Sequence, residues 1–263
     1  MLDITEDYGL CDYERLKQYT LLKTLVATDI SQEVSDELEL MINRACLRVD
    51  VVAEELGEYL FHNGFKGSEK MFDLSEIKVA EFLLSRCIKL CDESEPMYFN
   101  FLLVTAFLKE SVFHFFLKYK CFRILYVADF CLEILYDEVF WKGFNSKNFY
   151  KKLKLFCQEF FNRFSSDSTS CALQDSTFGK YCIDIVDERL NVIDDSFSLD
   201  ETNVEVFEKY YSLESIVKRE EWPILRKTEI AESAYFDARK YYTSNCETCG
   251  SKCSDYLNYM NFF

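Results

Sequence analysis

Glycine, proline and histidine are scarce in this chain. Its 263 residues include only 7 Gly, 2 Pro and 2 His. A β-sandwich or β-barrel needs many tight reversals, which Gly and Pro commonly supply, so this composition argues against both folds. Two histidines also leave few candidates for acid–base catalysis at neutral pH. Long helices joined by short polar loops fit the composition better.

Segments typical of export, membrane insertion and catalysis are also missing. No basic start is followed by an apolar run, so we expect no secretory signal. The longest uncharged run, residues 96–108, is shorter than the roughly 20 apolar residues that cross a bilayer. Gly-rich phosphate loops, HExxH and GxSxG do not occur. We therefore expect a cytoplasmic protein that is not an enzyme, with no small-molecule substrate and no membrane association.

Apolar residues, by contrast, are abundant, at 49% of the chain with 25 Phe and 17 Tyr. Apolar side chains recur at three- and four-residue steps, which indicates amphipathic helices over 13–26, 38–60, 73–91 and 147–164. The third of these is expected to begin with a capping box formed by Asp73 and Glu76. Two segments, one opened by Pro96 and one over 121–141, are apolar on nearly every side and should form the centre of the fold. Shorter helices are expected at roughly 178–192, 202–219 and 222–243.

These patterns predict an all-α fold of about nine helices, arranged as a multi-helix bundle or as stacked antiparallel helix pairs. Residues 1–164 are predicted to form the main helical domain. The Ser/Thr-rich segment 165–177 is predicted to be a polar linker or loop. Residues 178–263 should form a C-terminal helical region with a Cys-rich tail, packed on the first domain.

The formal net charge is -16, and one segment departs from this acidity. Residues 109–154 hold nine basic and five acidic residues, a local charge of +4, which leaves -20 for the remainder. Because nucleic-acid binding depends on neutralising phosphates, an acidic chain could bind nucleic acid only through such a local exception. The candidate phosphate-binding residues are Lys142, Lys147, Lys151, Lys152 and Lys154, extended by Lys118, Lys120 and Arg123 if a turn brings them near. The alternative is an ordinary solvated helix face.

The 12 cysteines fall into two groups. Nine are scattered through apolar or helical sequence and are interpreted as small core residues, namely Cys11, Cys46, Cys87, Cys91, Cys121, Cys131, Cys157, Cys171 and Cys182. Cys246, Cys249 and Cys253 lie close enough in sequence to bind one Zn²⁺, but a structural zinc site needs a fourth ligand, for which His62 or Cys182 are candidates. Free thiols, or a disulfide or redox pair, are the alternatives. No other cofactor is expected.

The two histidines have simple structural interpretations. His114 lies in VFHFFL and is expected to be a core histidine with its hydrogen bonds satisfied. His62 precedes Asn63-Gly64, where a helix is expected to end.

The N-terminal part of the chain resembles a known family. Residues 64–111 contain KMFD (70–73), AEFLLSRCIKL (80–90) and YFNFLLVTAFLKES (98–111) in that order, after a leucine-rich entry helix at 13–31. This order resembles a widespread eukaryotic domain-of-unknown-function family, whose microsporidian branch supplies the microsporidian dormancy factor. The resemblance covers about the first 140 residues. The Cys-rich tail has no counterpart in the family.

The resemblance implies a ribosome hibernation factor, an all-helical protein that occupies the tRNA exit site and keeps ribosomes inactive. The implied partners are basic ribosomal proteins, which complement the acidic chain, and rRNA, which would meet the lysine-rich segment. The alternative is an acidic helical scaffold or adaptor that binds basic partner proteins without any ribosome.

Overall fold

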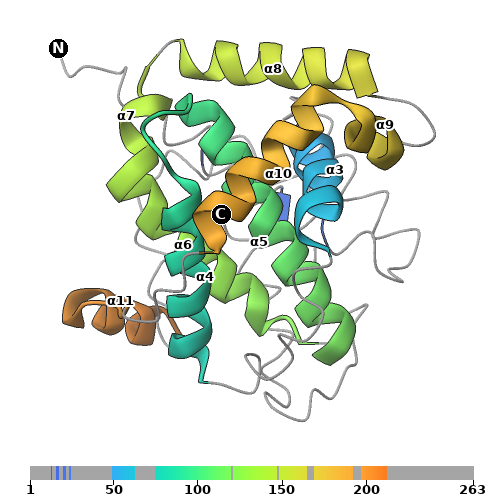
Figure 1. The fold of residues 1–263 in the computed structure, drawn as a ribbon. Coiled ribbons are helices and arrows are strands. Elements are labelled where there is room, and N and C mark those ends of the chain that lie inside the picture. Colours follow the sequence, from blue (N-terminus) through green and yellow to red (C-terminus); the bar gives the residue numbers. More distant parts are fainter. Residues whose placement is uncertain are drawn as a thin grey trace, which may run out of the picture.

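A computed structural model of the chain describes residues 49–62, 75–119, 121–146, 148–164, 169–191 and 197–211, with Tyr13, Leu16, Lys17, Thr20, Leu21 and Thr24. These residues are mainly helical and include no strand, which confirms the all-α prediction (Figure 1). The elements are α3 (Val49–Phe61), α4 (Glu76–Leu90), α5 (Met97–Tyr119), α6 (Arg123–Leu135), the π-helical η2 (Tyr136–Phe140), α7 (Trp141–Phe144), α8 (Phe149–Phe164), α9 (Thr169–Asp175), α10 (Thr177–Leu190) and α11 (Glu201–Tyr211).

Helix α5 lies at the centre, with α3, α4, α6 and α8 packed against it. Every residue from Phe99 to Val112 is buried, as predicted for a helix that is apolar on nearly all sides. Thr105 and Ser111 fit this core because their hydroxyls donate to the carbonyls of Phe101 and Phe107, at 2.7 and 2.8 Å. By length and composition α5 could cross a membrane, and 83% of its most apolar window is buried inside the fold.

The start of α4 differs from the predicted capping box. The helix begins at Glu76, and its N-cap is Ser75, whose hydroxyl accepts from the backbone N–H of Lys78. Glu76 therefore lies in the first turn, beside the positive end of the helix dipole, where an acid is favourable. The predicted Asp73 lies outside the described residues.

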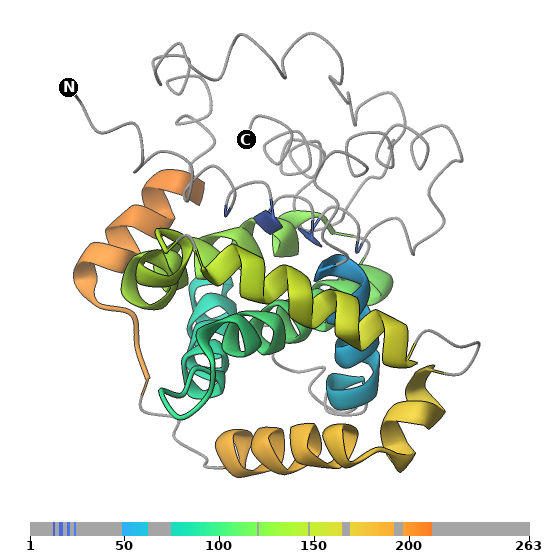
Figure 2. The ribbon, with the colours of Figure 1, turned by 90° about the horizontal axis from the view of Figure 1, so that it is seen from above.

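The segment 165–177 is helical over Thr169–Asp175, where a linker or loop was predicted. Its polar residues cap helices: Thr169 donates to the Phe164 carbonyl at 2.9 Å, and Ser176 accepts from the backbone of Gly179 at 2.8 Å. Because Ser and Thr are common both in loops and at helix ends, their composition alone did not distinguish the two. Buried Leu173 anchors α9, and α10 then packs along α3 and α4 (Figure 2).

The predicted helix over 121–141 contains a π-helical turn that the apolar pattern did not reveal. Helix α6 continues directly into η2 and α7. Tyr136, in this turn, packs on the ring of Tyr13 with centroids 4.5 Å apart, and Tyr13 also contacts Phe144 at 4.9 Å. These ring contacts hold Tyr13 against the core.

Replacing Gly179 by Ala should destabilise the α9–α10 junction. A Cβ at this position would lie 2.0 Å from the carbonyl oxygen of Leu173, a backbone atom that cannot move without displacing α9. We expect a loss of about 1–3 kcal/mol in the free energy of unfolding, measured by urea denaturation. Lys180→Ala, at the exposed next position of α10, is the control and should change stability by less than about 0.5 kcal/mol. A G179A variant as stable as the parent would contradict the packing described.

Candidate functional site

The lysine-rich segment forms an exposed surface at the start of α8. Lys151, Lys152 and Lys154 are exposed, while Phe149 before them and Leu153 among them are buried. This alternation holds α8 against the core and turns the lysines outward.

Helix α7 adds a fourth lysine to this surface. Lys142 is exposed next to Gly143, which packs on Phe149 at the start of α8. We call Lys142, Lys151, Lys152 and Lys154 the α8 lysine surface. Lys147, predicted with them, lies outside the described residues.

Lys118 and Arg123 do not extend this surface. The first residue of α5, Met97, touches Gly143 beside the α8 lysine surface, whereas Lys118 comes 21 residues later. At 1.5 Å per residue, this places Lys118 about 30 Å away along the helix. The Arg123 side chain is only 12% exposed and forms an ion pair with Glu76. Lys120 lies outside the described residues.

The first turn of α8 carries two basic residues. The first turns of α3, α4 and α11 carry Asp50, Glu76 and Glu201, as the positive end of a helix dipole favours, while those of α5, α6, α9 and α10 have no acid. The first turn of α8 has no acid and carries Lys151 and Lys152 instead. Lysines and helix start therefore add to one positive region, where an anion would be stabilised.

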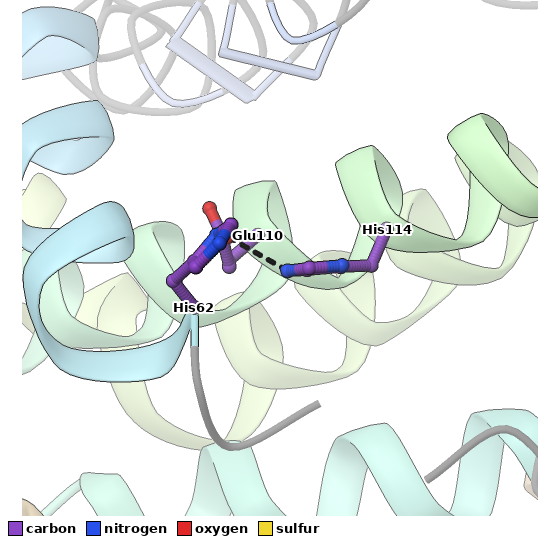
Figure 3. Close-up of side chains that lie close together, drawn as sticks. All are labelled: His62, Glu110 and His114. Atoms are coloured by element: carbon purple, nitrogen blue, oxygen red, sulfur yellow. Dashed lines mark hydrogen bonds and ion pairs between the residues drawn. The ribbon is translucent and has the colours of Figure 1, made fainter. Parts of the chain in front are cut away.

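A second cluster joins the only two histidines to a carboxylate. The Oε1 atom of Glu110 lies 2.9 Å from Nδ1 of His62 and 3.0 Å from Nε2 of His114. The three side chains converge between the end of α3 and the middle of α5 (Figure 3). Their potential ligand atoms all lie within 4.8 Å of one another. Among the described residues, this is the only such group of three or more His, Cys, Asp or Glu side chains.

Close packing of α3 on α5 creates this cluster. Gly57 faces the backbone of Ala106, where an added Cβ would lie 3.0 Å from the carbonyl oxygen. One turn later, Phe61 meets Phe107 edge-on with ring centroids 5.4 Å apart. His62 follows Phe61 and therefore comes to lie over Glu110.

Sequence reasoning missed this cluster because it treated the histidines separately. His114 lies in a core helix, but its side chain is 22% exposed and faces Glu110, which was not considered as its partner. The spacing of Glu110 and His114, four residues apart on one helix face, was a usable signal. The contribution of His62 depends on how α3 pairs with α5, which the sequence pattern alone did not predict.

The cysteines follow the core interpretation except at one position. Cys87, Cys121, Cys131, Cys157 and Cys182 are buried and Cys91 is half-buried, but Cys171 is exposed. Burial raises the pKa of the Cys182 thiol to about 12, so it is held protonated and is a poor zinc ligand where it lies. Cys11, Cys46, Cys246, Cys249 and Cys253 lie outside the described residues, and so does the predicted tail zinc site.

A small pocket of about 10 Å³ lies between Glu76, Val79, Phe115, Arg123, Ile124 and Val127. This is about the space of a single water molecule.

Comparisons with protein families, curated proteins and solved structures gave no match.

Proposed function

We propose that this protein is a ribosome hibernation factor that occupies the tRNA exit site and keeps ribosomes translationally inactive. The α8 lysine surface contacts rRNA phosphates, and the acidic remainder faces basic ribosomal proteins. This role requires a rigid shape and complementary charge, and no chemical reaction. It rests on the family resemblance of the N-terminal part together with one structural observation.

That observation is the exposed lysine surface at the start of a helix, in a chain of net charge -16. Lysines in a first turn oppose the helix dipole and so weaken the helix slightly. A phosphate bound there would reverse this effect, because it interacts favourably with both the ammonium groups and the helix start. Residues that weaken a helix of the isolated protein are often explained by a role in binding.

The surface is supported in a fixed position. Phe149, Leu153, Cys157, Phe160 and Phe164 bury the opposite side of α8. The exposed Trp141, next to Lys142, offers a flat aromatic ring that could stack on an unpaired base. The arrangement suits contact with the phosphate backbone of folded RNA, since such contacts fix the orientation of the protein without reading a base sequence.

Co-sedimentation with purified 80S ribosomes tests this function. We expect the protein to travel with the ribosomes at low salt and to leave them as salt rises. Four lysine–phosphate contacts predict roughly a 100-fold loss of affinity between about 50 and 200 mM salt. A protein that stays at the top of the gradient at low salt would contradict the proposal.

An acidic scaffold that binds basic proteins is the second candidate, and the charge of -20 outside residues 109–154 favours it. It predicts binding to free basic proteins and no co-sedimentation with intact ribosomes. Because its contacts would use acidic residues, substituting the α8 lysine surface would leave its binding unchanged.

A further inference from the structure

We propose that His62, Glu110 and His114 bind one Zn²⁺ ion, which ties the end of α3 to the middle of α5. None of its three ligands is a cysteine of the tail. The site is also independent of the proposed ribosome role, because its test uses the isolated protein.

The side chains are a suitable ligand set for zinc. Imidazole nitrogens and carboxylate oxygens bind Zn²⁺ at about 2.0–2.2 Å, and two histidines with one glutamate are a known three-ligand combination. Two ligands of a tetrahedral ion at these lengths are about 3.3 Å apart. The two Glu110–histidine distances, 2.9 and 3.0 Å, need to open by only a few tenths of an ångström. The two imidazoles have ring centroids 5.0 Å apart, and their ligand nitrogens, which lie within 4.8 Å of each other, must come to about 3.3 Å.

The surroundings favour a partly open site. Glu110 belongs to the buried stretch of α5, and its side chain is 10% exposed, so its carboxylate is held in place. The His62 side chain is 41% exposed and gives the ion a path from solvent. Three protein ligands leave the fourth position of a tetrahedral zinc for water.

A hydrogen-bonded trio without metal is the competing explanation. Both imidazoles can donate an N–H to the same carboxylate oxygen, which would satisfy Glu110 in the absence of an ion. The two explanations differ in metal binding, because only the zinc site gives stoichiometric binding that depends on all three side chains.

The experiment uses the full chain carrying C246S, C249S and C253S, since the tail thiols would otherwise compete for metal. After treatment with a chelator and dialysis, Zn²⁺ is titrated by calorimetry. Co²⁺ is then used as a spectroscopic probe. We expect one equivalent of zinc and a visible cobalt spectrum without the near-ultraviolet charge-transfer band of thiolate ligands. Mg²⁺ should not compete, because it prefers oxygen ligands.

The substitutions H62A, E110Q and H114A should each weaken zinc binding at least about 100-fold, because even residues that only support metal ligands contribute 10–100-fold. Glu93→Gln, at an exposed carboxylate outside the cluster, is the matched control and should bind as the parent does. Circular dichroism checks that each variant is folded, and E110Q, which keeps the shape of the side chain, preserves the test if an alanine variant unfolds.

Two results would overturn the zinc site. One is binding of less than about half an equivalent of zinc by the chain without tail thiols. The other is unchanged affinity in the folded H62A, E110Q and H114A variants. Either result would leave the cluster as a hydrogen-bonded trio, and neither would affect ribosome attachment.

Discussion

Replacing Lys17 by Met is expected to destabilise the fold by about 3–5 kcal/mol, the typical loss when one partner of a buried ion pair is removed. The ammonium group of Lys17 lies 3.0 Å from a carboxylate oxygen of Asp129 and 2.8 Å from one of Glu133. The Lys17 and Asp129 side chains are 1% and 5% exposed. Without the lysine, the buried Asp129 carboxylate would lose the ammonium group that lies 3.0 Å away, whereas Glu133 is 37% exposed and can be hydrated.

The double variant Lys17→Met with Asp129→Leu separates the lost ion pair from the lost packing. It should recover most of the stability, because apolar residues of similar volume replace both buried charges. Urea denaturation followed by circular dichroism measures each free energy of unfolding. Lys151→Met, at an exposed position, is the control and should change stability by less than about 0.5 kcal/mol. Parent-like stability of K17M would show that the pair is not buried in solution.

Reversing the charge of Lys151, Lys152 and Lys154 to Glu should weaken ribosome binding at least about 100-fold. Three phosphate contacts are lost and three repulsive charges are added, and each contact releases counterions when it forms. Because these side chains are exposed, the fold should tolerate the changes. The dissociation constant of fluorescently labelled protein on 80S ribosomes, measured at low salt, gives the effect.

The control variant K89E/K118E/K180E changes the net charge equally, on α4, α5 and α10. It should bind within a few-fold of the parent, since the local surface and not total charge determines attachment. Equal loss of binding in both triple variants would contradict a role for the α8 lysine surface. Unchanged binding in K151E/K152E/K154E would contradict it as well.

The helices themselves could be predicted from the sequence, because their apolar spacing is a local property. The stretch that follows Pro96 formed α5, and the amphipathic helix predicted over 147–164 formed α8, with Phe149, Leu153, Phe160 and Phe164 buried. The exposed lysines of α8 follow from the same pattern, since residues between buried positions face outward.

Features that depend on contacts between helices could not be predicted in this way. Lys17 is buried with Tyr13, Leu16, Thr20, Leu21 and Thr24, although a lysine was not expected on an inward face. Its partners Asp129 and Glu133 are more than 100 residues away in sequence. The meeting of His62 with Glu110 likewise requires α3 to cross α5 at Gly57. Lys118 was grouped with Lys151 because both belong to the basic segment 109–154, but the length of α5 separates them in space.

Resting ribosomes imaged with this protein bound by electron cryo-microscopy would test the central claim most directly. We expect density for an all-helical protein in the tRNA exit site, with Lys151, Lys152 and Lys154 at ion-pair distance from rRNA phosphates. Density at another site, or a complex in which α8 faces solvent, would contradict it.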